Sequence, residues 1–148
     1  MRLIFNILAI TGSAMFAGAM LTIGVTLGGY WRSLPAAEFL DWFSQHSHFV
    51  MRTIPLVVVP TLIGLAGSVW LGWSEATMRM LWLGASICIA AVLLLTVTWF
   101  LPTNAQFVAK SVPLDQLPGK LDTWLMIHNL RIALAVVASV LGIVAITK

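Results

Sequence analysis

The chain has 148 residues, of which 60% are hydrophobic and only 9% charged, and its mean hydropathy is +1.00. Because a soluble domain carries about 25% charged residues, this composition excludes a soluble protein and predicts an integral membrane protein. The net charge of +3 comes from a few scattered Lys and Arg residues, so no basic stretch suggests nucleic-acid binding. At about 20 residues per span, the length fits a single domain, residues 1–148, with four spans and short loops.

The first predicted span covers residues 3–30. Its start resembles a cleavable signal peptide, with Arg2 before an apolar run that reaches Ala17, Gly18 and Ala19. The apolar run continues well beyond that point, which favours an uncleaved span. Gly24 and Gly28 lie four residues apart and would allow another helix to approach closely. That helix could belong to this bundle, to a second copy of the chain or to a larger membrane complex.

The loop after the first span, residues 32–48, is predicted to contain a short interfacial helix. Pro35 can start a helix, and the residues that follow alternate apolar and polar side chains in an amphipathic pattern. His46 and His48 end this loop. Apolar runs then predict three further spans, with Pro55 and Pro60 kinking the first of them and Pro102 ending the second, over residues 49–73, 75–101 and 123–146.

These elements predict an all-α fold, an antiparallel up-down four-helix bundle in the membrane. In this topology the first and third loops lie at the same end of the bundle. That end collects most of the polar side chains that the apolar pattern does not explain, which are His46, His48, Arg52, Asn104, Trp124, His128 and Arg131. The polar asymmetry points to a site open to one side of the membrane only, rather than to a channel, which needs polar residues along its whole depth.

On the last span, Trp124, His128 and Arg131 are spaced four and three residues apart and therefore share one helical face. An unpaired cation at depth costs on the order of 3 kcal/mol or more, and no span contains an acid near enough to pair with Arg131. We expect its partners to be backbone carbonyls near the kinked second span, Asn104, water, or a ligand with an anionic or carbonyl oxygen. Alternatively, Arg131 only ties loop carbonyls together and fixes the geometry of the bundle.

The three histidines raise the question of a metal. His46, His48 and His128 could supply three imidazole ligands to a transition metal. Only His128 lies within a span, which argues against a haem held by two histidines in the bilayer. We therefore expect no metal or cofactor, and keep a haem or a transition metal bound by these three residues as the alternative.

Two segments resemble a known family. The third span ends in Pro102-Thr103-Asn104 and the fourth opens with Trp124-x3-His128-Asn129-x-Arg131, a pattern similar to the anthrone oxygenase-like family of small four-span membrane proteins. The similarity is clearest over residues 95–146. Family members often carry Asn, or Asn-His, where this chain has His128-Asn129. Some fungal members act in aromatic polyketide pathways.

The resemblance implies a cofactor-independent oxygenase that oxidises a lipophilic anthrone- or quinol-like substrate. In that role His128 would act as general base, while Arg131 and Asn104 would stabilise the developing oxyanion. The same resemblance assigns substrate binding to three further residues, Trp124, Trp99 and Asn129.

Two other functions remain open at this stage. A non-catalytic membrane subunit or a lipid- or quinone-binding protein would show Arg131 bonded to loop carbonyls without a cavity beside it. A metal- or haem-binding protein would show the three histidines converging. For location, we expect the bacterial inner membrane. The positive charges of the two ends nearly balance, and Arg2 before the first span suggests a cytoplasmic N-terminus.

Overall fold

The computed structural model describes all 148 residues and consists of helices joined by short turns. The first span is continuous although it changes its winding, from α1 through a π-helical turn, η1, into α2. The third span does the same from α4 through a second π-helical turn, η2, into α5. The elements in order are α1 (Arg2–Thr22), η1 (Ile23–Leu27), α2 (Gly28–Ser33), α3 (Ala36–Leu71), α4 (Ala76–Leu95), η2 (Thr96–Phe100), α5 (Leu101–Val108) and α6 (Leu117–Ile146).

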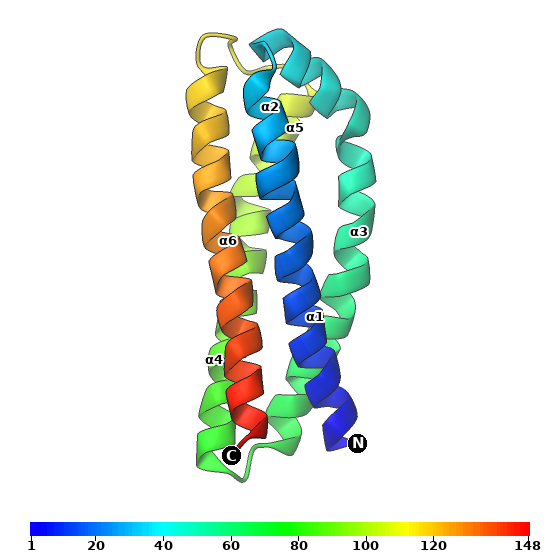
Figure 1. Cartoon of the computed structure of the whole chain (residues 1–148), viewed down its shortest axis with the longest axis vertical. Coiled ribbons are helices and arrows are strands. Elements are labelled where there is room, and N and C mark those ends of the chain that lie inside the picture. The colour runs from blue at the N-terminus through cyan, green and yellow to red at the C-terminus, as the bar shows by residue number, and fades with distance from the viewer.

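Four helical segments are long and apolar enough to cross a membrane, which confirms the predicted four-span bundle. They contain 32, 36, 33 and 30 residues, namely Arg2–Ser33, Ala36–Leu71, Ala76–Val108 and Leu117–Ile146. At 1.5 Å per residue even the shortest exceeds the hydrocarbon thickness of about 30 Å, so the helix ends reach the interfacial regions. Figure 1 shows the up-down arrangement, with both termini at one end and the first and third loops at the other.

The predicted interfacial helix is present as helical structure, but it is not a separate element. Pro35 precedes α3, which then continues without interruption to Leu71. No glycine or proline occurs between Ala36 and Ile54 to break it, so the amphipathic segment becomes the first turns of the second span. Figure 1 shows these turns crossing the end of the bundle before the helix turns down along it.

The third span extends further than the position of Pro102 predicted. The helix passes Pro102 and ends at Val108, so Asn104 lies inside a helix rather than in a loop. A proline lacks an N–H group and crowds the carbonyl four residues earlier. Here the wider turn η2 immediately precedes α5, and Pro102 occupies the first turn of α5, where its missing N–H group is least costly.

The interior divides into two clusters of buried side chains. One fills the end of the bundle near the termini and includes Trp82, Ala85 and Ala135. The other lies at the loop end, and we call four of its aromatic members, Trp31, Phe39, Phe43 and Phe107, the aromatic cap. Edge-to-face contacts connect the cap, with ring centroids 5.2 Å apart for Phe39 and Phe107 and 5.3 Å apart for Phe43 and Phe107.

Gly24 and Gly28 are used within the bundle. A Cβ atom on Gly28 would lie 2.5 Å from Leu125 Cδ2, and one on Gly24 would lie 3.0 Å from His128 Cδ2. Both glycines therefore face α6 of the same chain. This result supports the internal-packing alternative, and α6 already occupies the surface that an oligomer contact through these glycines would need.

The closest helix approach in the bundle sets a test of stability. A Cβ atom on Gly64 of α3 would lie 2.2 Å from the backbone nitrogen of Ala9 in α1, whereas one on Gly18 would meet nothing within 4 Å. Gly64→Ala should therefore lower the free energy of unfolding by about 1–3 kcal/mol, because backbone cannot yield as a side chain can. Gly18→Ala is the matched control and should be neutral or slightly stabilising. Thermal unfolding in detergent measures both, and equal stabilities would contradict the predicted packing.

Candidate functional site

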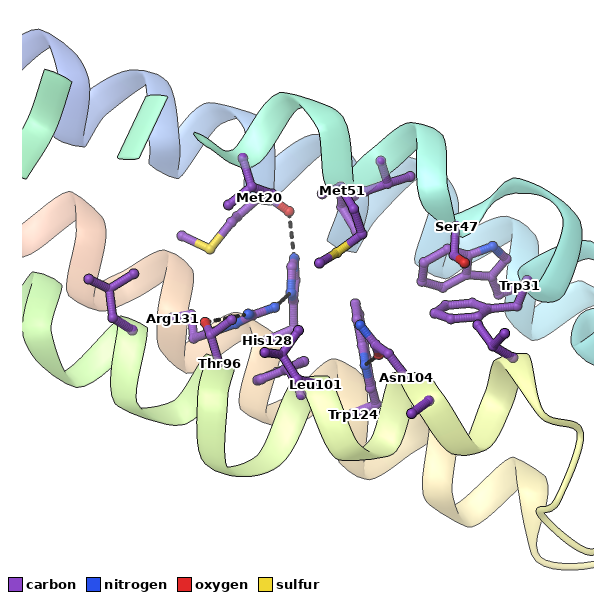
Figure 2. Close-up of a pocket in the computed structure, with 18 of the residues that line it drawn as sticks. Met20, Trp31, Ser47, Met51, Thr96, Leu101, Asn104, Trp124, His128 and Arg131 are labelled. Atoms are coloured by element: carbon purple, nitrogen blue, oxygen red, sulfur yellow. Dashed lines mark hydrogen bonds between the residues drawn. The ribbon is translucent and has the colours of Figure 1, made fainter. Parts of the chain in front are cut away.

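A cavity of about 190 Å³ lies inside the bundle, between the two buried clusters. Of its 19 lining residues, 14 are hydrophobic. The polar ones include Asn104, His128 and Arg131, which come from two different spans. Figure 2 shows these side chains pointing into the same space, with Met20 and Met51 on the opposite side.

Arg131 is the deepest charged group of the site. It is the fifteenth of the 30 residues of α6, about 21 Å from the start of that helix, and its side chain is buried. Nη1 donates to Thr96 Oγ1 at 3.1 Å, and Nη2 donates to His128 Nδ1 at 2.5 Å. The guanidinium carbon also lies 3.3 Å from the centroid of the Phe100 ring, a cation–π contact.

No carboxylate neutralises this guanidinium. The ion pairs of the chain, Arg32 with Asp122 and Lys110 with Asp41, are solvent-exposed. Arg131 Nε is buried and has no hydrogen-bond partner. The observed partners also differ from the expected ones, because neither Asn104 nor a carbonyl of the second span contacts Arg131. The site therefore holds a buried cation that has one nitrogen, Nε, without any hydrogen-bond partner.

The hydrogen bonds of His128 fix its tautomer. An arginine can only donate, so His128 Nδ1 must accept from Arg131 and carries no proton. Nε2 therefore carries the proton and donates to the backbone carbonyl of Met20 at 2.7 Å. The imidazole is neutral in this arrangement, which avoids placing a second positive charge beside Arg131.

Local backbone features allow these contacts. The absence of a side chain at Gly24 leaves room for the His128 ring, whose Cδ2 would lie only 3.0 Å from a Cβ atom there. Gly24 belongs to η1, while Thr96 and Phe100, the partners of Arg131, are the first and last residues of η2. Wide π-helical turns of this kind re-aim side chains and are frequent at functional sites. Both of them adjoin this cavity.

Trp124 connects Asn104 to His128 through a hydrogen bond and a ring contact. Its Nε1 donates to Asn104 Oδ1 at 2.9 Å. Its ring stacks on His128, with centroids 4.8 Å apart and an interplanar angle of 12°. Phe100 packs edge-on against the same Trp124 ring, with centroids 5.1 Å apart. With its oxygen engaged, Asn104 retains an amide nitrogen that makes no hydrogen bond within the protein and can donate to a ligand.

The structure thus brings together four of the six residues assigned from the sequence. His128, Arg131, Asn104 and Trp124 all line the cavity, and the predicted common face of Trp124, His128 and Arg131 is confirmed. The other two do not line the cavity. Asn129 is exposed, because each helical residue is rotated by about 100° from the one before and His128 already faces inward. Trp99, likewise, precedes the inward-facing Phe100 and packs beside it.

The three histidines do not converge, so the geometry expected for a metal site is not found. His46 stacks on Trp42, with ring centroids 5.0 Å apart, and its Nδ1 donates to the carbonyl of that residue at 2.8 Å. His48 is exposed and packs against Phe49. Nowhere in the chain do three His, Cys, Asp or Glu side chains come together. Both nitrogens of His128 are engaged by Met20 and Arg131.

Several residues of the site were not identified from the sequence. Thr96 and Phe100 hold the guanidinium, the Met20 carbonyl holds His128, and Trp31 and Phe43 line the cavity from the aromatic cap. A hydroxyl within a span is the one feature that could have pointed to Thr96. The Met20 carbonyl could not have been found, because every residue has one and only the folded structure selects it.

The hydrogen bonds of the two imidazole rings predict opposite neutral tautomers for His128 and His46. In NMR spectra of protein carrying isotope-labelled histidine, His128 should be neutral with its proton on Nε2, because Arg131 occupies Nδ1. Neutral His46 should carry its proton on Nδ1, which donates to Trp42. Arg131→Gln should remove the constraint on His128 and leave the His46 signals unchanged. A proton on Nδ1 of His128 would contradict the assigned hydrogen bonds.

Comparison with known proteins places this site in a family. A family model described as anthrone oxygenase matches residues 39–141, well over half of the chain. The match begins in α3, extends to near the end of α6, and includes Asn104, Trp124, His128 and Arg131. No curated protein and no solved structure matches the chain. The chain is a four-span membrane protein that belongs to the anthrone oxygenase family.

Proposed function

We propose that this protein is a cofactor-independent oxygenase that binds a lipophilic anthrone- or quinol-like substrate in the cavity. The observation that carries the proposal is Arg131, a buried guanidinium that lines an apolar cavity, lacks a carboxylate partner and keeps N–H groups without hydrogen bonds. An isolated cation in this setting is costly. A ligand with a carbonyl or anionic oxygen would provide the missing partner.

The size and walls of the cavity suit an aromatic ligand. An apolar cavity of about 150 Å³ binds benzene, so about 190 Å³ has room for a larger aromatic ligand. Ring edges and faces from Phe100 and Trp124 border the space. Few polar groups in a mostly apolar pocket would fix the orientation of such a molecule.

The reaction balances without any further oxidant. The methylene group of an anthrone and one O2 give the carbonyl of an anthraquinone and one H2O. Loss of a proton from the methylene carbon forms an enolate, which bonds to oxygen to give a peroxide at that carbon. The peroxide then loses water, made from its outer oxygen, the remaining hydrogen on that carbon and one returned proton, and the new carbonyl remains.

Three polar residues of the cavity have roles in this scheme. Arg131 and the amide nitrogen of Asn104 stabilise the negative oxygen of the enolate, in a site from which water is excluded. His128 accepts the proton at Nδ1 when Arg131 turns a donor from His128 toward the substrate oxygen. The Met20 carbonyl keeps the Nε2–H group oriented and stabilises the imidazolium that forms. One movement of Arg131 thereby binds the substrate oxygen and frees Nδ1 of His128 to act as the base.

The same geometry favours one alternative, a quinone- or lipid-binding protein without turnover. Its support is the cavity with spare donors at Arg131 and Asn104, which would hold a carbonyl oxygen whether or not chemistry follows. A purely structural Arg131 is not favoured, because its partners are Thr96 and His128 rather than loop carbonyls, and a cavity adjoins it.

We also propose a location, the bacterial inner membrane with a cytoplasmic N-terminus. Support comes from Arg2, whose position before the first span is that of a signal-anchor. Since both termini lie at one end of the bundle, the cavity end would then face the other side of the membrane.

Oxygen uptake with an anthrone tests the proposed activity. The purified wild type in detergent should consume one O2 per anthrone, faster than buffer with detergent alone. His128→Ala and Arg131→Gln should each lower kcat/KM by about 100-fold or more, since one removes the base and the other the charge that stabilises the oxyanion. Elemental analysis and an absorbance spectrum of the same sample test the absence of a metal or haem.

The remaining histidines provide matched controls. His46→Ala and His48→Ala change the same residue type outside the cavity and should keep wild-type rates. If the wild type binds anthraquinone but does not accelerate oxygen uptake, the oxygenase is wrong and the binding protein takes its place. Equal losses for all three histidine variants would contradict the assignment of His128.

A further inference from the structure

The cavity has a rim on the outer surface of the bundle, between α3 and α5. Four of its lining residues are also exposed, and all four are apolar. Met51 lies on α3, while Leu101, Ala105 and Val108 lie on α5, and the exposed fractions of the three larger side chains are 43%, 41% and 46%. Figure 2 shows Met51 facing the helix that carries Leu101 and Asn104.

The other ends of the cavity are closed. Toward the loops it meets Trp31 and Phe43 of the aromatic cap, each 3% exposed, whose rings are 5.6 Å apart. Phe107, also of the cap, packs behind Phe43 with no exposed surface. Toward the termini it meets the buried side chains of Phe16 and Met20. No route therefore leads along the bundle axis to water.

Because the rim is apolar and lies on spanning helices, the medium outside it is lipid. We infer that the substrate enters the cavity sideways from the bilayer, through an opening between α3 and α5 rimmed by Met51, Leu101, Ala105 and Val108. The identity of this substrate as a lipophilic aromatic ketone rests on the proposed function. The opening itself rests on the shape of the cavity and the exposure of its rim.

The sequence of α3 allows the helix to bend beside the opening. Pro55 has no N–H group, so the carbonyl of Met51, four residues earlier, has no helical donor. The helix is thus weakened at the residue that forms one side of the rim. Prolines are a usual cause of bending in helices, and a small outward movement of α3 here would widen the opening without disturbing α6.

A bulky residue at the rim should slow entry and exit alike. In Ala105→Trp, and in Met51→Trp on the opposite side, we expect the association and dissociation rate constants for anthraquinone to fall together by about tenfold, so that Kd changes much less than either rate constant. Stopped-flow quenching of tryptophan fluorescence in lipid nanodiscs measures both constants. Ala133→Trp is the matched control, because Ala133 is an exposed alanine of α6 that does not line the cavity, and its rates should equal those of the wild type.

The outcomes separate this inference from the proposed activity. Unchanged rates in both rim variants, or a changed Kd with an unchanged association rate, would overturn the lateral opening while leaving the oxygenase intact. Slowed exchange in a protein that shows no oxygen uptake would support the opening and overturn the oxygenase. Failure of the wild type to bind anthraquinone at all would overturn the inferred entry of an aromatic ketone, whereas the oxygenase would still be decided by oxygen uptake.

Discussion

The structure depends on how a guanidinium group is kept in the middle of a membrane span. Arg131 is held by the hydroxyl of Thr96, the ring nitrogen of His128 and the face of Phe100, and none of these carries a negative charge. Such an arrangement gives hydrogen-bond partners to two of its five N–H groups without neutralising its charge. The charge therefore remains available to a ligand, and its field acts in a low-dielectric interior where it is weakly screened.

The backbone of the helices around Arg131 makes room for the guanidinium group and its partners. Two spans carry a π-helical turn at the level of the site, and the second of these supplies both Thr96 and Phe100. Gly24 leaves room for the ring of His128, so that the ring can reach a backbone carbonyl of α1. An imidazole anchored in this way is neutral and fixed in orientation. It can accept a proton at Nδ1 only when its hydrogen bond with Arg131 opens. In the proposed reaction, this would couple ligand binding to the availability of the base.

The cavity lies where packing is interrupted between two well-filled regions. The aromatic cap closes it from the loops, and the cluster around Trp82 fills the end near the termini. The lining residues that are exposed at the outer surface, Met51, Leu101, Ala105 and Val108, all lie on α3 and α5. The proposed reaction would benefit from an end closed to water and an apolar side, since water would protonate an enolate and a lipophilic substrate would arrive from the bilayer.

Hydropathy by itself determined the four spans, their up-down order and the end of the bundle at which the site lies, because length and apolar character leave no other stable arrangement in a bilayer. The spacing of Trp124, His128 and Arg131 determined their common face, since the period of a helix is fixed. The helix boundaries followed less directly from the sequence. Pro102 did not end its span, because it lies in the first turn of α5, directly after the wider π-helical turn η2.

Only the tertiary structure decided which residues face the cavity, excluding Trp99 and Asn129, and which groups hold Arg131 and His128. Those choices depend on the relative rotation of four helices and on backbone groups that every residue possesses, and no local pattern in a sequence encodes either.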